Sequence, residues 1–137
     1  MLASYTEAQL IIAEAQLEAG NYAGAGGTLA ILNNLRANSG MAGLTPLAPA
    51  ATPQAQLSQL FNERAFWLYL TAHRLGDLRR LSRPAPSGYG LNPESVFPTG
   101  TYTGRGGGVY GTDVNFPIPI DETNSNPNSQ GCIDRNP

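Results

Sequence analysis

The sequence contains no lysine, and only 13% of its 137 residues are charged, which is about half the usual share. All eight basic residues are arginines, and ten acidic residues bring the formal net charge to -2. A chain with this balance has no excess of positive charge to attract nucleic acid or an anionic membrane surface. The composition therefore excludes a protein that binds polyanions through its net charge.

Cysteine and histidine occur once each, as Cys132 and His73. One cysteine cannot form an internal disulfide, and the two residues lack the spacing of a zinc site. The acidic and amide residues of 121–131 lack the pattern of an EF-hand, and the glycine-rich stretch 104–111 lacks the lysine of a phosphate loop. We interpret these stretches as a surface turn and a hairpin tip, and we expect neither a metal nor a cofactor.

Long hydrophobic runs are also missing, and none approaches the length of a membrane span. The first residues, "MLASYTEAQLII", lack the basic region and the cleavage site of a signal peptide. We therefore expect either a cytoplasmic protein or the mature or partial form of an exported one.

The residues that are present divide the chain into two parts. Residues 5–82 are rich in Ala and Leu with a helical period, whereas residues 84–137 are rich in Gly, Pro, Asn, Ser and Thr. We predict a single, mainly α domain with a helical part over 1–83 and an irregular, Gly/Pro-rich C-terminal wrap over 84–137.

The first two predicted helices form a tetratricopeptide-like hairpin. The first follows Ser4 or Thr6 as the cap and stops at Gly20, and the second spans 21–40. The residues that follow the helical spacing on one face are Leu10, Ile11, Glu14 and Leu17 on the first helix and Tyr22, Ala25, Leu29, Leu32 and Leu35 on the second.

A long third helix is predicted from Thr52 or Pro53 to Leu81. Its apolar stripe is wide, so we expect it to be covered on more than one side, with Trp67 and Tyr69 in the core. After it we expect short extended pieces at 95–97 and 114–120.

This third helix carries most of the candidate polar chemistry. On a continuous helix Glu63 and Arg74 would share a face, and His73 and Asp77 would lie within side-chain reach. One interpretation makes His73 a general base oriented by Asp77. The other is a structural ion network, with the members Glu63, Arg64, His73, Arg74, Asp77, Arg79 and Arg80. No Ser or Cys nucleophile lies in a recognisable motif, so we favour the network and expect no catalysis.

Three tyrosines in the C-terminal part, Tyr89, Tyr102 and Tyr110, are candidates for exposed stacking on a ligand. The alternative is that they fasten the irregular wrap to the helices.

The order of the motifs resembles the C-terminal part of the SusD/RagB family. The hairpin "AEAQLEAGNYAGA" is followed by "NERAFWLYLTAHRLGDLRR", then "VFPTG", then "NFPIPIDETNSNPN". This resemblance implies a helical, tetratricopeptide-type scaffold and a non-enzymatic protein that binds glycans or other nutrients. It also implies a TonB-dependent transporter as partner, at the cell surface on the outer membrane. The signal peptide and the lipid-anchored Cys of the family have no counterpart in this sequence.

A second hypothesis is a structural module. An isolated tetratricopeptide-like hairpin leaves apolar surface that neighbouring repeats normally cover. Such a surface can join copies of the chain into homo-oligomers or filaments that bind no ligand of their own.

Overall fold

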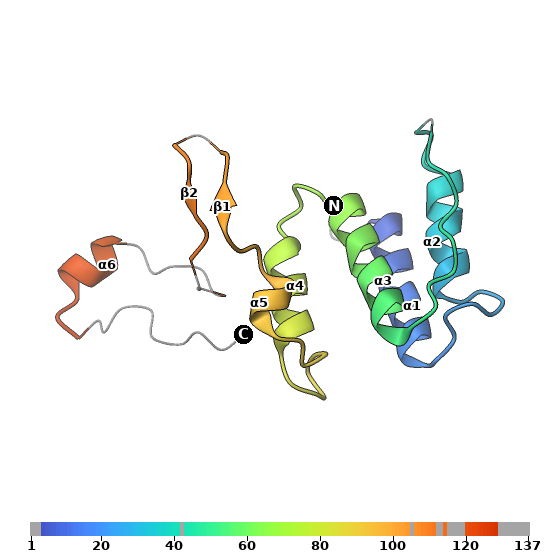
Figure 1. Cartoon of the computed structure of the whole chain (residues 1–137), viewed down its shortest axis with the longest axis horizontal. Helices are drawn as coiled ribbons and strands as arrows, with labels where there is room; N and C mark the ends of the chain where they lie inside the picture. Colours follow the sequence, from blue (N-terminus) through green and yellow to red (C-terminus); the bar gives the residue numbers. More distant parts are fainter. Residues whose placement is uncertain (1–3, 42, 105, 112–113, 115–119, 129–137) are drawn as a thin grey trace. The chain divides into compact units, whose positions relative to one another are not determined.

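The computed structural model describes residues 4–41, 43–104, 106–111, 114 and 120–128, and it is mainly helical, as predicted (Figure 1). The chain forms two compact units, residues 1–73 and 74–137, which are described separately below. The predicted division at residue 83 within a single domain stays a prediction.

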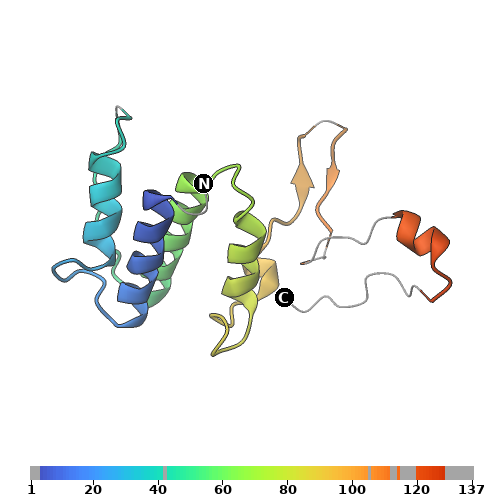
Figure 2. The same ribbon diagram turned by 180° about the vertical axis from the view of Figure 1, so that it is seen from behind.

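The first unit is a bundle of the helices α1 (Tyr5–Glu18), α2 (Thr28–Ala37) and α3 (Pro53–Trp67), each in contact with the other two (Figure 2). Each helix contributes one fully buried leucine to the core, and these are Leu10, Leu32 and Leu60. The buried hydroxyl of Thr28 donates a hydrogen bond to the Ala13 carbonyl at 2.8 Å, which joins the start of α2 to the middle of α1. The predicted helical hairpin is therefore present.

The cap of α1 is Ser4, one of the two predicted candidates. Its side chain accepts a hydrogen bond from the Glu7 backbone N–H at 3.1 Å, which satisfies one of the free donors at the helix start. The helix ends before Gly20, whose φ of 76° is the left-handed conformation that glycine adopts at little cost.

The second helix is shorter than predicted, because α2 begins at Thr28. Residues 21–27 form turns instead, and the carbonyl of Asn21 accepts a hydrogen bond from the Thr28 N–H at 3.1 Å. Glycines 24, 26 and 27 disfavour helix here, since each costs about 1 kcal/mol relative to alanine in a helix interior.

The third helix also differs from the prediction. It ends at Trp67, and a separate helix, α4 (Arg74–Ser82), follows after a turn over 68–73. Within the turn, the Leu68 carbonyl accepts hydrogen bonds from both the N–H and the hydroxyl of Thr71, at 3.2 and 2.5 Å. Local bonding of this kind competes with the helical hydrogen-bond ladder.

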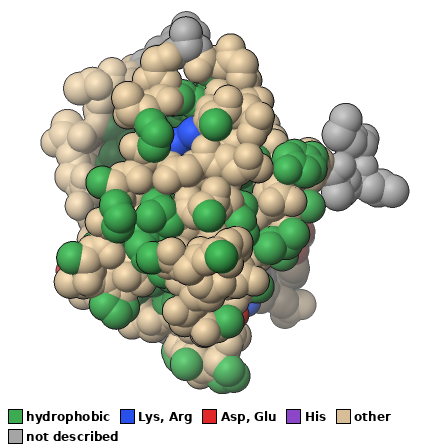
Figure 3. Space-filling model, turned by 90° about the vertical axis from the view of Figure 1, so that its right-hand side faces the viewer, with side chains coloured by type: hydrophobic (Ala, Val, Ile, Leu, Met, Phe, Trp, Pro, Cys, Tyr) green, Lys and Arg blue, Asp and Glu red, His purple; other side chains and the backbone are tan. Residues whose placement is uncertain are grey.

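The segment between α2 and α3 has no helix or strand over residues 44–50, and we call these residues the strap. Side chains of α2 bind its backbone. Asn33 donates to the Leu47 carbonyl at 3.3 Å and accepts from the Leu47 N–H at 2.7 Å, and Arg36 Nη1 donates to the Thr45 carbonyl at 2.8 Å. Figure 3 looks onto the side of the first unit formed by α2 and the strap, where few charged atoms are visible.

The second unit contains α4, the short helices α5 (Pro93–Val96) and α6 (Ile120–Ser125), and the strands β1 (Thr101–Tyr102) and β2 (Gly108–Val109). Leu78 and Leu81 of α4 are buried, and α4 contacts α5. The prediction of an extended piece at 95–97 is wrong, because most of these residues belong to α5. Most of the piece predicted at 114–120 lies outside the described residues.

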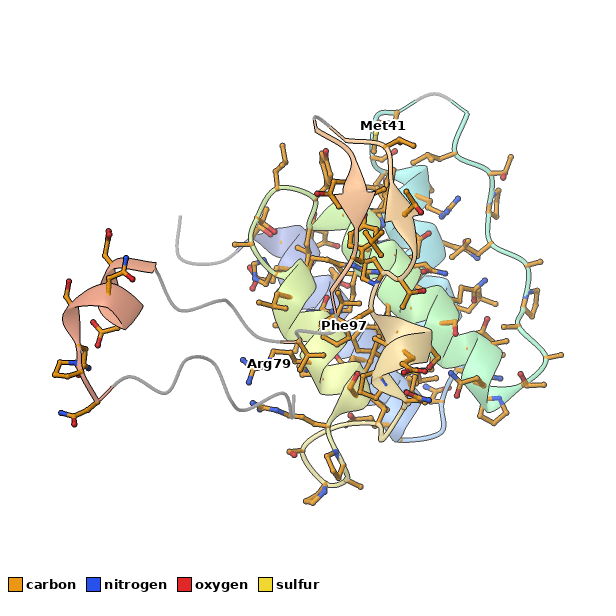
Figure 4. The ribbon with its side chains drawn as sticks, turned by 60° about the vertical axis from the view of Figure 1, so that its left-hand side comes forward. Met41, Arg79 and Phe97 are labelled. Carbon is orange, nitrogen blue, oxygen red and sulfur yellow. The ribbon has the colours of Figure 1, made fainter. Side chains whose placement is uncertain are left out.

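Several side chains predicted to be buried are exposed. Tyr69 is 74% exposed and Ile11 is 56% exposed, and Ala25 is also exposed, while Trp67, predicted in the core, is half-buried. Tyr69 follows the end of α3, so the helical stripe that placed it in the core does not continue that far. Met41, labelled in Figure 4, is another exposed apolar side chain, just before the strap.

Candidate ligand-binding surface

A two-stranded hairpin brings Tyr102 and Tyr110 together. Strands β1 and β2 pair antiparallel with Tyr102 opposite Gly108, and the Tyr110 N–H donates to the Gly100 carbonyl at 2.8 Å. Because alternate residues of a strand share a face, Tyr110 lies on the same face as Gly108 and therefore as Tyr102. The two ring centroids are 5.2 Å apart with a tilt of 52° between the planes. Both rings are partly exposed, at 37% and 45%.

Gly108 leaves room for the Tyr102 ring. A Cβ atom at this position would be 2.7–2.8 Å from three atoms of the Tyr102 side chain, which is closer than real Cβ contacts allow. At Gly104, in the loop of the same hairpin, a Cβ would be 3.4 Å from the nearest ring atom, an ordinary contact. Glycine at 108 therefore lets the Tyr102 ring approach the hairpin backbone closely, beside Tyr110.

Tyr89 belongs to a different structure, the turn after α4. Its backbone N–H donates to the Arg80 carbonyl at 3.1 Å, and its side chain is half-buried. Tyr102 and Tyr110 form a contact pair on the hairpin, whereas Tyr89 is anchored to the end of a helix.

The charged residues of the first unit form ion pairs between helices. The buried carboxylate of Glu63 accepts from Arg36 Nη2 at 2.6 Å, from Arg36 Nε at 3.1 Å and from Trp67 Nε1 at 2.9 Å. The hydrogen bond to Glu63 raises the pKa of the Arg36 guanidinium, although burial acts in the opposite direction. A second pair joins Arg64 Nη1 to Glu14 Oε2 at 3.7 Å, with both side chains buried.

These hydrogen bonds and ion pairs link α1, α2 and α3 to one another and leave the carboxylates engaged with arginines. A carboxylate held this way is an anchor between helices and is poorly placed to move protons. The geometry of the first unit is thus that of a scaffold.

Comparison with known proteins decides the family. Residues 5–136 match the SusD family. The chain belongs to the SusD family. No curated protein and no solved structure matches the chain.

SusD-family proteins bind ligands and are not enzymes, they are associated with the outer membrane, and they generally pair with TonB-dependent transporters. Among the described residues of this SusD-family chain, no helix is long and apolar enough to cross a membrane.

The continuous third helix on which two of the expected pairings rest is divided in this SusD-family chain. Glu63 belongs to α3 and Arg74 to α4, and Arg74 is exposed. His73 contacts Glu7 of α1, with 3.1 Å between Nε2 and Oε1, so that its described carboxylate partner is not Asp77. The break at residues 68–73 separates the members of the predicted set.

Within α4, the buried Asp77 pairs with Arg80 at 3.6 Å, three residues away. Arg79, labelled in Figure 4, has a buried Nε that donates no hydrogen bond within the described part of the chain. Phe97, also labelled there, is half-buried directly after α5. A structural role for these arginines stays a prediction.

Sequence reasoning missed Arg36, Glu14 and Glu7, which provide the partners of three predicted residues. A signal for Arg36 exists, because it is the only charged residue between Glu18 and Glu63. An isolated charge in so long a neutral stretch indicates a specific partner, since a surface arginine usually has charged neighbours. Glu14 and Glu7 have no comparable signal, because other charged residues lie near them in the sequence.

The residues that the structure describes contain no cluster of side chains suited to bind a metal ion. Across residues 4–41, 43–104, 106–111, 114 and 120–128, no three His, Cys, Asp or Glu side chains gather closely enough to hold an ion.

Proposed function

We propose that this chain binds a glycan or a similar nutrient, and that Tyr102 and Tyr110 form the platform on which the ligand stacks. The observation that carries the proposal is the contact between the two rings on the exposed hairpin. Tyrosine combines a broad apolar face with a hydroxyl that can hydrogen-bond, which suits a sugar ring with its apolar face and polar edge. Tyr89, in the turn after α4, is a further candidate.

The hairpin also favours binding because it presents the rings with little freedom. The Tyr102 ring lies against Gly108 and next to Tyr110, so its rotamers are restricted before any ligand arrives. Binding then costs less conformational entropy than it would with two free side chains.

We further propose that the ligand is passed to a TonB-dependent transporter on the cell-surface side of the outer membrane. The support is membership of a family whose members generally have such partners.

Calorimetric titration against a panel of soluble polysaccharides tests this function. We expect saturable binding to at least one, and a loss of affinity of about tenfold or more in Tyr102→Ala and in Tyr110→Ala. Tyr69→Ala is the matched control, because Tyr69 is also an exposed tyrosine but lies in the first unit. No saturable binding to any polysaccharide, or an equal loss in the control, would argue against the proposal.

A second candidate function is self-assembly through the first unit. Large apolar side chains are exposed on α1, at the end of α3 and in the turn after it, and they are Tyr5, Ile11, Ile12, Phe66, Tyr69 and Leu70. Apolar surface of this kind is commonly covered by a partner, and here a second copy of the chain can serve. Light scattering would show mass increasing with concentration, whereas a constant monomer mass excludes this function.

A further inference from the structure

The strap, residues 44–50, is held on the first unit through its main chain. All six hydrogen bonds that the structure describes for it join a side chain of the unit to a backbone atom of the strap. Three of them come from α2, two between Asn33 and Leu47 and one from Arg36 to Thr45. Bonds to the main chain give affinity for an extended segment whatever its side chains are.

The other three bonds come from α3 and from Tyr22. Gln59 donates to the Ala48 carbonyl at 3.0 Å, and Gln56 donates to the Ala50 carbonyl at 3.2 Å. The Tyr22 hydroxyl accepts from the Ala50 N–H at 2.8 Å. The groups that hold the strap therefore follow it from residue 45 to residue 50.

The strap has the period of a polyproline II helix. Leu44, Leu47 and Ala50 are half-buried, whereas the four residues between them are exposed. Polyproline II repeats every three residues, and Pro46 and Pro49 favour it because proline fixes φ at about −65°. No backbone–backbone hydrogen bond is described for residues 44–50, and polyproline II has none of its own.

The strap adds nothing to the buried core of the first unit. None of residues 44–50 is buried, and the buried apolar side chains of this unit lie within residues 10–35 and 57–68. The helices thus form the core by themselves, and the strap lies on its surface as a bound peptide does.

Two of the side chains that hold the strap are fixed by other bonds. Arg36 is held by the carboxylate of Glu63, and the amide oxygen of Gln59 accepts from the Tyr22 hydroxyl. The Gln59 NH2 group is therefore left to face the strap. Groups that are fixed before a ligand arrives lose less conformational entropy when it binds.

We propose that this surface is a peptide-binding site and that the strap is its built-in occupant. The site consists of the side chains of Tyr22, Asn33, Arg36, Gln56 and Gln59. The ligand that fits it is a segment of a partner protein in polyproline II conformation, with an apolar side chain at every third position. The strap competes with such a segment at an effective concentration of about millimolar, so the partner binds only where the strap is released.

Fluorescence anisotropy of a labelled peptide tests the site. The peptide has the sequence of residues 43–51, and the protein is the full chain with residues 44–50 replaced by a Gly/Ser stretch of the same length, which leaves the site empty. We expect saturable binding to this released chain, and binding at least about tenfold weaker to the wild-type chain. Equal affinity for the two chains would show that the peptide binds elsewhere.

Matched changes test whether the main chain is recognised. N-methylation of Leu47 in the peptide removes the N–H that bonds Asn33, and should weaken binding about three- to tenfold. N-methylation of Ala48 is the control, because no hydrogen bond is described for its N–H. In the released chain, Asn33→Ala should weaken binding about tenfold, whereas Asn34→Ala, at an exposed neighbour on α2, should leave it unchanged. Equal effects within either pair contradict the proposal.

A second released chain covers the case in which the first does not fold, as judged by circular dichroism. Leu47→Gly weakens the hold of the strap and changes nothing else. The proposal is overturned if no folded released chain binds the peptide. It is also overturned if neither chain folds, because the strap is then part of the core and not the occupant of a site. No polysaccharide is used, so the outcome is independent of whether the chain binds glycans.

Discussion

At the scale of the residue, Gly88 shows how a missing side chain lets two backbone segments approach closely. It lies in the turn after α4, where a Cβ atom would be 2.3 and 2.4 Å from the carbonyl oxygens of Arg80 and Arg83. These carbonyls belong to the end of the helix and its continuation, and they accept hydrogen bonds from the N–H groups of Tyr89 and Gly90. The absence of a side chain at 88 thus lets the following turn supply the donors that the helix end needs.

Replacing Gly88 with alanine is expected to destabilise the chain by about 1–3 kcal/mol, since the backbone must move to admit the methyl group. Gly76→Ala is the matched control. Gly76 lies inside α4 with open space around its Cβ position, so alanine there should stabilise the helix by about 1 kcal/mol. Thermal unfolding measured by circular dichroism compares the two, and equal melting temperatures would contradict the packing described here.

At the scale of the element, the division between α3 and α4 could not be predicted from the sequence, whereas the first helix could. The first helix and its Ser4 cap were predictable, because a capping residue, an apolar period and a terminal glycine agree. The end of α3 was not, because residues 68–73 contain no glycine or proline and continue the apolar period. The turn depends on contacts from Thr71 and His73, and one of these reaches across to α1, which a local pattern does not reveal.

The turn over residues 68–73 contains two residues with left-handed backbone, Leu70 and Ala72, whose φ values are 61° and 64°. Ala72→Gly should stabilise the first unit by about 1 kcal/mol, because glycine adopts a φ of 64° without the steric cost that alanine incurs. Urea unfolding monitored through Trp67 measures the effect. A decrease in stability would show that this residue does not have the left-handed conformation.

At the scale of the whole molecule, the chain combines a helical scaffold unit with a second unit that carries the exposed tyrosine hairpin. The candidate tyrosines were identifiable from the sequence, since they are aromatic residues in a stretch rich in glycine. Their pairing was not, because it depends on the register of β1 and β2, which sets Tyr102 opposite Gly108. The ion network stays a prediction, and the partners that Glu63, Arg64 and His73 have in the structure come from helices far away in sequence.

We propose that Gly108 leaves room for the Tyr102 ring beside Tyr110, and that the two rings together bind the ligand. The decisive measurement is the Kd of Gly108→Ala and of Gly104→Ala for a polysaccharide that the wild-type chain binds. Alanine at 108 collides with the Tyr102 ring and must also adopt a φ of 153°, which side chains rarely adopt, so the hairpin has to shift. Alanine at 104 makes an ordinary contact with the ring, and neither change removes an aromatic side chain. We expect the Kd to rise about tenfold in Gly108→Ala and to stay within about twofold in Gly104→Ala. Equal Kd values in the two variants would contradict the claim.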